Sequence, residues 1–498
     1  MIYGFNSFGY EGFLFKVETE VKDGVPAIDI AGLADSCVSS TRELVKTAIE
    51  RSGFEIPQKR ILASLSPLDL KKEGGFSFPI ALSLLVESKI NDVLVMGVLE
   101  TDGNIFPRIK DIFAACQNAK RKGIKYAVLP RGSVVPCGIK VYEASTLKEA
   151  ADAITSLNIG DDRLFKENIA SDEFSTDDNI LFNDVTPDLK QEFDKTENNN
   201  LKFAVAVAIA GRHHTLVFSN PYYSRINTLS IIETGLQMLL PRLSADENNA
   251  VSRIYSLAGL YRQDLYERPV RMPHKSSSIE GMCGGGIGCH PGEVALAHNG
   301  VLFLEDATEF RTSVLQMLRV PLSTGNITLS RAGRSTIFPS KFQLFMTTSP
   351  CPCGNFGSKE KLCLCSKTAI ETFKKKLMFP LGDRLAIRIN TNGDDDSVKN
   401  FTLEELRRFI STAWKRQIRR QGKLNQDLSI SEAFDLKISD EAKAFFEEAT
   451  EGFSVNRKAE ILKLAQTLND ISDDYSDELQ KNHIREAIKL NGKTPAEA

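Results

Sequence analysis

The segment at residues 213–229 joins a run with buried-strand character, a tight loop and a helix start, and it limits the fold most strongly. In a parallel α/β sheet this unit is the setting of a phosphate-binding P-loop. Such a loop needs glycines, so that backbone N–H groups can surround a phosphate, and a Lys-Ser/Thr pair for phosphate and Mg²⁺. The segment therefore predicts an α/β fold, but by itself it does not identify a nucleotide site. At the corresponding positions the chain has Ser219, Tyr222, Ser224, Arg225 and Ile226.

The composition is that of an ordinary globular chain, with 498 residues, 42% of them hydrophobic and 26% charged. This length is enough for two to four domains. No apolar run reaches the roughly 18 residues of a membrane span, and the N-terminus lacks a secretion signal, so we expect a cytoplasmic protein that is not in a membrane. Nine cysteines, four of them in Cys-x-Cys pairs, suit a reducing compartment. The net charge of −3 gives no overall sign of nucleic-acid binding, although a local basic surface remains open.

The chain divides into three predicted blocks and a linker. Residues 1–156 alternate short apolar strands with helices, and residues 201–395 alternate strands and helices as a parallel α/β sheet does. Between them, residues 157–200 hold twelve Asp/Glu and four Lys/Arg, which predicts a flexible, solvated linker. The last block, 396–498, is helical in pattern. Its expected helices are 402–421, 439–450, 456–473 and 479–490.

The strongest single motif is Gly-Val-Leu-Phe-Leu-Glu-Asp at 300–306. An apolar strand there delivers Glu305 and Asp306 to its carboxyl end, which is the end where parallel sheets bind ligands. In a Walker B element the first acid organises the Mg²⁺ shell and the second polarises the attacking water. The alternative is a buried strand that ends in an acidic turn.

The order of these motifs resembles that of the magnesium-chelatase-like AAA+ family, the ComM/YifB competence-associated proteins. The run at 298–310 is followed by Ser-Pro-Cys-Pro-Cys-Gly at 349–354, and the resemblance spans essentially the whole chain. Further matching segments are 32–35, 52–54, 67–74, 79–82, 268–274, 284–286, 291–293, 318–322, 330–332, 461–467, 483 and 486–487. The resemblance implies an N-terminal Lon-protease-like, ribosomal-S5-like α+β domain, a central AAA+ domain and a C-terminal helical lid. It also implies a hexameric ring that uses ATP and Mg²⁺, with DNA branch migration as an activity of family members.

The chain departs from the family pattern throughout the P-loop. Arg225 stands where the resemblance places the Lys, and its planar, longer side chain is no substitute for a compact point charge. Ile226 stands where the Mg²⁺-binding Thr belongs. Tyr222 replaces a glycine, so a side chain occupies space that the backbone needs to approach phosphate.

Other nucleotide-site elements differ as well. Glu305-Asp306 reverses the Asp-Glu order of the family, Ser349 replaces a sensor Asn, and Asn456 aligns with the sensor Arg of the lid. Arg384 keeps the family residue, as the arginine finger that reaches the nucleotide of a neighbouring subunit. A surface salt bridge is the alternative role for Arg384.

These changes together predict that ATP hydrolysis is lost or weak, and that the chain is a scaffold or ring subunit that binds DNA or protein. The alternative is an active DNA-stimulated ATPase, a branch-migration helicase in recombination during transformation. A metal-chelatase subunit is a third, weaker hypothesis, because it rests on the family name and the lid alone.

Two Cys-x-Cys pairs form a candidate metal site. Four thiolates in one short loop suit tetrahedral Zn²⁺, although a single residue between paired cysteines is tighter than the usual spacing. A reduced thiol cluster and a redox-active pair are the alternatives. The four ligands would be Cys351, Cys353, Cys363 and Cys365.

Four arginines are candidate DNA contacts. Two of them lie between β-like runs and would stand at the tip of a hairpin. Their contacts with phosphates would be independent of sequence and sensitive to salt. A solvated hairpin tip explains the same pattern. The four are Arg268, Arg271, Arg331 and Arg334.

Overall fold

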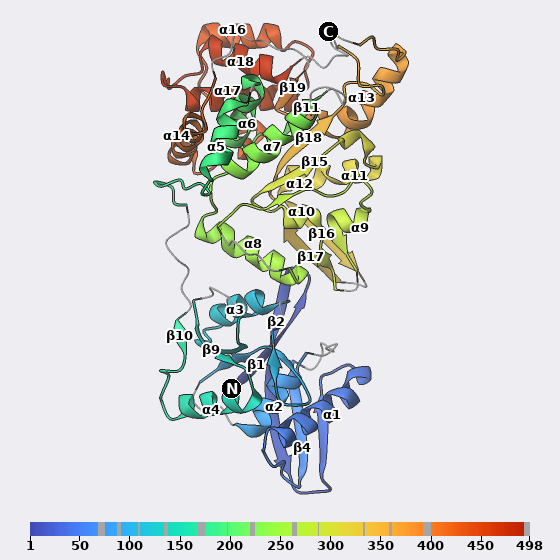
Figure 1. Ribbon diagram of the computed structural model, residues 1–498, viewed down its shortest axis with the longest axis vertical. Coiled ribbons are helices and arrows are strands. Elements are labelled where there is room, and N and C mark those ends of the chain that lie inside the picture. The colour runs from blue at the N-terminus through green and yellow to red at the C-terminus, as the bar shows by residue number, and fades with distance from the viewer. Residues whose placement is uncertain are drawn as a thin grey trace.

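The computed structural model describes most of the chain, and Figure 1 shows an elongated molecule with the N-terminal domain at one end. The described residues are 1–67, 75–86, 91–107, 110–133, 138–167, 175–196, 198–219, 225–286 except 261–265, 288–331, 334–357, 361–391 and 400–492. Among them, no helix combines the length and the apolar character that a membrane-spanning helix requires.

The N-terminal domain is built on a mixed sheet. Its described strands number eight, in the order β10-β9-β8-β5-β1-β2-β4-β3. They are β1 (Ile2–Phe8), β2 (Glu11–Lys22), β3 (Ala27–Ala31), β4 (Arg60–Ser66), β5 (Val93–Val95), β8 (Tyr126–Pro130), β9 (Lys140–Ala144) and β10 (Lys166–Glu167). Along β4, buried residues alternate with more exposed ones, as expected of a strand with one face on the core.

Helices and a small hairpin complete this domain. The strands predicted within 14–21, 27–30, 61–65 and 127–129 are confirmed, and so is the helix near 39–52. The helices are α1 (Asp35–Arg51), α2 (Ser77–Leu85), α3 (Ile112–Arg121) and α4 (Leu147–Asn158), and the hairpin pairs β6 (Val98–Leu99) with β7 (Ile105–Phe106).

The central domain has a parallel sheet, as predicted. Its five described strands have the order β12-β15-β18-β11-β19, and every pairing among them is parallel. They are β12 (Val270–Arg271), β15 (Val301–Leu304), β18 (Gln343–Thr348), β11 (Thr215–Phe218) and β19 (Ile387–Asn390). All residues of β11, β15 and β18 are buried, because helices cover both faces of a parallel sheet.

Most helices of this domain lie between the strands in sequence. Two β-hairpins also project from it, and the one predicted around residues 331–334 is confirmed. The helices are α6 (Asn199–Gly211), α7 (Arg225–Leu239), α8 (Ala245–Ala258), α9 (Ile279–Cys283), α10 (Glu293–Leu296), α11 (Thr312–Met317), α12 (Arg319–Thr324) and α13 (Lys367–Leu381). The hairpins are β13 (Gly284–Gly285) with β14 (His290–Pro291), and β16 (Asn326–Arg331) with β17 (Arg334–Pro339).

The C-terminal region is a helical lid that packs on α6 and β19. The predicted helices are confirmed to within two residues at each end. Thr402 begins the first of them with a capping box, in which its side chain and that of Glu405 bind each other's backbone N–H. The helices are α14 (Leu403–Gln421), α15 (Ile430–Phe434), α16 (Asp440–Ala449), α17 (Val455–Ile471) and α18 (Lys481–Asn491).

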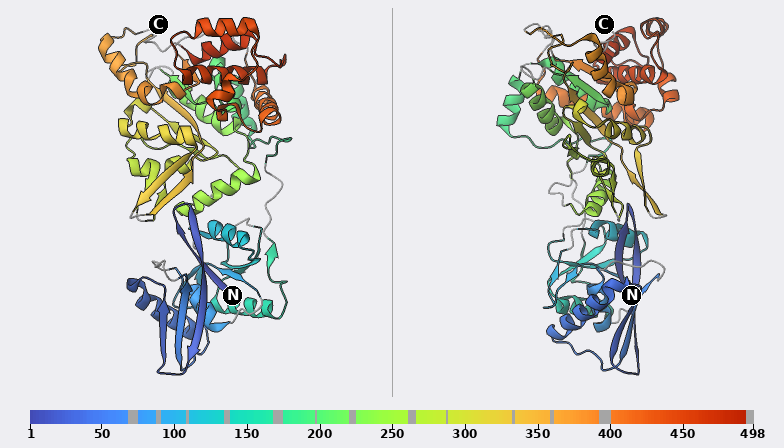
Figure 2. Two further views of the ribbon diagram at one scale, coloured as in Figure 1. Left: turned by 180° about the vertical axis from the view of Figure 1, so that it is seen from behind. Right: turned by 90° about the vertical axis from the view of Figure 1, so that its right-hand side faces the viewer.

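The tip of the β1–β2 hairpin joins the N-terminal domain to the central one. It reaches α8 and the β16–β17 hairpin, as both views in Figure 2 show. The Tyr10 N–H donates to Thr336 Oγ1 over 2.9 Å, and the buried Arg253 donates to the Tyr10 carbonyl over 3.0 Å. Gly9 has φ +58°, and a Cβ there would lie 2.3 Å from Thr336. The close approach of the two domains therefore requires glycine at this position.

The acidic segment is more ordered than its composition predicted. Its second half contains α5 (Pro187–Lys195), whose Phe193 is buried against the central domain. Asp194 accepts a hydrogen bond from the Leu403 N–H over 2.7 Å, which ties α5 to the lid. The prediction of a flexible linker is therefore wrong for this half, because the burial of Phe193 and the contact with the lid hold α5 in place despite the charges around it. The domain boundaries at 156, 200 and 395 stay predictions.

Candidate nucleotide, metal and DNA sites

Strand β11 lies between β18 and β19 and places a loop at the carboxyl edge of the sheet. The chain adds strands first on one side of β11 and then on the other, and ligands of open α/β sheets bind at such a switch point. Ser219 is buried directly after β11, and its N–H donates to the Thr348 carbonyl over 3.0 Å. Tyr222 and Ser224 lie outside the described residues. Arg225 and Ile226 open α7, which confirms the predicted strand and helix on the two sides of the loop.

Glu305 and Asp306 follow β15 at the same edge. Asp306 has φ +50°, a left-handed backbone conformation that Asp tolerates better than most other residues do. Its N–H donates to Thr347 Oγ1 over 3.3 Å, and Lys275 Nζ lies 4.0 Å from its carboxylate. The unusual Glu-Asp order thus places the residue better suited to this backbone at the second position.

Two further residues complete this edge. Ser349 directly follows β18, and the Thr348 hydroxyl contacts Thr308 Oγ1 at 3.0 Å. Glu233 on α7 is a residue that the sequence analysis missed. Burial raises the pKa of Glu233, and the charge of Glu305 raises it further, so the two acids lie near enough for their charges to interact. Nothing in the sequence indicates this pair, because 72 positions separate the two residues.

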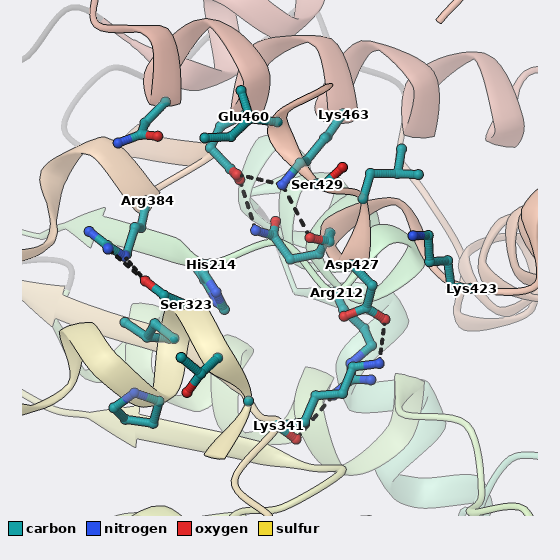
Figure 3. A pocket seen from close by; sticks show the side chains of 18 of the residues that line it. Arg212, His214, Ser323, Lys341, Arg384, Lys423, Asp427, Ser429, Glu460 and Lys463 are labelled. Carbon is teal, nitrogen blue, oxygen red and sulfur yellow. Dashed lines mark hydrogen bonds and ion pairs between the residues drawn. The ribbon is translucent and has the colours of Figure 1, made fainter. Parts of the chain in front are cut away.

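Arg384 and Asn456 lie elsewhere, at the amino edge of the sheet. Both line a pocket of about 650 Å³ between the central domain and the lid (Figure 3). Arg384 donates to Ser323 Oγ over 2.6 Å, and burial together with the charge of Arg319 lowers the pKa of its guanidinium. The same pocket includes His214, which stands directly before β11.

Several cations line this pocket, and three of them are paired with acids. Lys341 binds Asp427 over 2.7 Å, and Lys463 binds Glu460 over 2.9 Å. Lys423 is likewise paired over 2.7 Å, with Glu432. Among the described lining residues, the positive charge beyond these pairs therefore comes from Arg212 and Arg384.

Arg457 follows Asn456, the position that the family resemblance aligns with a sensor arginine, and it is held inside the lid. It is buried, donates to Asn491 Oδ1 and to the Gly492 carbonyl over 2.9 Å each, and lies 3.9 Å from the Phe453 ring. Its guanidinium is thus fixed inside the lid, while the neighbouring Asn456 is exposed.

His213 is a core residue, as predicted. Its Nε2 lies 2.7 Å from Thr467 Oγ1 and its Nδ1 3.0 Å from Gln426 Oε1, which links the start of β11 to the lid. Burial lowers the pKa of the imidazole to about 3, so the ring is neutral near pH 7.

The four cysteines of the 351–365 loop converge in space. Their sulfur atoms all lie within 4.8 Å of one another, with three separations of 3.5, 3.6 and 3.7 Å. Zn–S bonds of about 2.3 Å in a tetrahedron imply sulfur separations of about 3.8 Å, whereas a disulfide needs about 2.05 Å. The donor set therefore fits one tetrahedral metal ion. The Phe356 N–H also donates to Cys351 Sγ over 3.3 Å, as backbone groups do around metal thiolates.

Two of the candidate DNA contacts are committed to internal pairs. Arg268 is buried and binds both carboxylate oxygens of Glu247, over 2.9 and 2.6 Å. Arg271 binds both carboxylate oxygens of Glu293, over 2.7 and 2.8 Å. Both guanidinium groups neutralise acids of the same domain, which argues against the predicted contacts with DNA; those contacts stay predictions. Arg331 is the last residue of β16 and Arg334 is the first residue of β17, so both lie at the tip of the hairpin, as expected.

The strand order, the loop after β11 and the helical lid together define an AAA+ core. Three family models match the chain: "Subunit ChlI of Mg-chelatase" at 17–133, "Magnesium chelatase, subunit ChlI" at 193–398 and "Magnesium chelatase, subunit ChlI C-terminal" at 402–491. The chain therefore belongs to the magnesium-chelatase-like AAA+ family.

Its relatives include proteins from several bacteria. The uncharacterized protein Rv2897c of Mycobacterium tuberculosis is 31% identical over 76% of this chain and 74% of its own length. The uncharacterized protein YifB of Escherichia coli is 29% identical over 95% and 93%. Competence protein ComM of Haemophilus influenzae is 28% identical over 98% and 96%.

Proposed function

We propose that this chain is a cytoplasmic AAA+ ring subunit that works by binding DNA, with its own ATP hydrolysis lost or weak. The observation that carries the proposal is the division of the site between two edges of one sheet. The altered positions at Ser219, Glu305–Asp306 and Ser349 share the carboxyl edge, whereas Arg384 lies at the amino edge. The four-residue strand β11 between them spans roughly 13 Å.

This separation gives Arg384 a role that does not depend on the chain's own P-loop. An arginine at the amino edge is too far away to contact a nucleotide at the carboxyl edge of the same sheet, but it could face the nucleotide of a neighbouring copy. AAA+ proteins typically oligomerise, and a hexameric ring would bring the two edges of adjacent subunits together. The chain would then retain the contact it offers to a neighbour while its own nucleotide site has changed.

A calorimetric titration with ATP·Mg²⁺, followed by a turnover assay with and without DNA, tests the proposal. We expect ATP binding that is too weak to measure at micromolar ATP. We also expect no ATP hydrolysis that depends on Glu305. The matched control is Glu309→Ala, an exposed acid in the same segment. Turnover near 1 s⁻¹, the low end for ordinary enzymes, that is lost in Glu305→Ala and kept in Glu309→Ala would refute the proposal. ATP-driven branch migration by this chain alone would establish the alternative, a DNA-stimulated helicase of recombination during transformation.

We propose further that Cys351, Cys353, Cys363 and Cys365 bind one Zn²⁺. Four soft ligands at tetrahedral separations and a backbone donor to one sulfur support this assignment. Elemental analysis should find about one zinc ion per chain, and Cys351→Ser should release it. The control Cys37→Ser removes a cysteine on α1 of the N-terminal domain and should leave the zinc content unchanged. Less than about half an equivalent, with four freely titratable thiols in the loop, would exclude the site.

A further inference from the structure

The cysteine loop displays two leucines that are almost fully exposed. Leu362 and Leu364 keep 81% and 84% of their surface accessible, the highest values among the described leucines. They alternate with Cys363 and Cys365, whose sulfur atoms point to the cluster. In an extended backbone successive side chains point to opposite sides, so a metal ion that holds the cysteines would fix both leucines outward.

The charge around these leucines is opposite in sign to the charge of the whole chain. Residues 361–376 contain five lysines and one glutamate, in a chain whose net charge is −3. Among these lysines Lys374 is buried and Lys376 donates to the Thr308 carbonyl, whereas Lys375 is exposed. Lys361 and Lys367 flank the leucines in sequence, and both are exposed. The loop thus combines an apolar tip with a basic surround, and this surround is complementary to a polyanion.

We propose that this loop binds single-stranded nucleic acid, with the lysines at the phosphates and the two leucines against the faces of unpaired bases. A duplex covers its base faces by stacking, whereas a single strand offers them to apolar side chains. A rigid loop loses little conformational freedom when it binds, which favours such a contact. This inference rests on the zinc ion and the DNA partner proposed above. In it, the cysteine loop takes the place of Arg268 and Arg271 as the surface that binds DNA.

Fluorescence anisotropy with a labelled oligothymidylate tests the inference on the full chain. Leu362→Ser with Leu364→Ser should weaken binding on the order of tenfold without changing its salt dependence. Lys361→Ala with Lys367→Ala should lower the slope of log affinity against log salt by about 1.4, since each lost contact with a single strand contributes about 0.7. Zinc content is measured for every variant, so that loss of the loop fold is not mistaken for loss of contact.

A matched control replaces apolar residues of equal exposure in a different domain. Val25→Ser with Ile159→Ser changes side chains that are 82% and 81% exposed, and it should leave binding unchanged. If zinc-loaded loop variants bind as tightly as the parent chain, this inference fails while the proposed DNA partner survives. If the parent chain binds no oligonucleotide at low salt, both fail.

Two other results would also overturn the inference. A leucine variant that bound DNA normally but lost self-association in light scattering would mark the loop as a contact between copies. Equal weakening for duplex and single-stranded DNA would show that unpaired bases are not what the leucines recognise.

Discussion

Replacing Arg268 by methionine should destabilise the central domain rather than alter DNA binding. The Arg268 guanidinium donates to both oxygens of Glu247, to the Asn299 carbonyl over 2.7 Å and to the Pro241 carbonyl over 2.9 Å. It also lies 5.0 Å from the ring of Trp414 on the lid. The substitution would leave a carboxylate and two carbonyls without these donors inside the protein.

The size of the effect follows from burial. Removing one member of a buried, hydrogen-bonded ion pair costs about 3–5 kcal/mol in the free energy of unfolding. The Arg268 side chain is 3% exposed and that of Glu247 is 27% exposed, so water would partly solvate the remaining acid. We therefore expect a loss of about 3 kcal/mol, part of which Glu247→Gln should restore in the double variant.

The pair also predicts a pH dependence. Burial alone would raise the pKa of Glu247, but the charge and hydrogen bonds of Arg268 hold that pKa at about 2. Since this is below the value of about 4.3 for an unfolded chain, the pair contributes its full stability above pH 4.3. That contribution is lost progressively as the pH falls towards 2. The Arg268→Met variant, which lacks the pair, should not show this pH dependence.

The assay is denaturant unfolding followed by the fluorescence of Trp414, the single tryptophan of the chain. Because its ring contacts Arg268, the signal reports on the unit that contains the pair. Arg311→Met, at an exposed arginine, is the control and should cost less than about 0.5 kcal/mol. A loss below about 1 kcal/mol for Arg268→Met, or a reduced salt slope of DNA binding at full stability, would refute the reasoning.

Two further predictions concern the domain contact and the buried histidines. Gly9→Ala would strain the backbone by roughly 1–2 kcal/mol and push against Thr336, so hydrogen exchange at residues 8–11 should rise. The control is Gly53→Ala, whose Cβ meets nothing within 4 Å and which should leave exchange at residues 8–11 unchanged. Equal exchange at these residues in the two variants would contradict this account of the hairpin tip. Burial lowers the pKa of three histidines to about 3, below the unfolded value of about 6.5, so stability should be complete above pH 6.5 and fall below it by at most about 1.4 kcal/mol per pH unit for each. Unfolding midpoints that are equal at pH 7.5 and pH 5.5 would contradict this prediction for the histidines. The histidines are His213, His214 and His298.

The sequence determined the features whose cause is local. Short apolar, β-like runs predicted β2 and β4, and the helical pattern of the tail predicted the lid helices. The apolar run before Glu305 predicted a buried strand with acids at its carboxyl end, and the paired spacing of four cysteines predicted their convergence. Each of these depends on residues within about twenty positions, so pattern and spacing are sufficient to reveal them.

Only the tertiary structure decided which side chains meet across the chain. Arg268 and Arg271 read as basic loop residues, yet acids 21 and 22 positions away neutralise them. Arg384 and Asn456 belong to one nucleotide-site pattern in sequence, but the chain folds so that they lie at the amino edge of the sheet. The sequence lists such charges without their partners, and an ion pair or a shared edge exists only once strand order and helix packing have brought distant segments together.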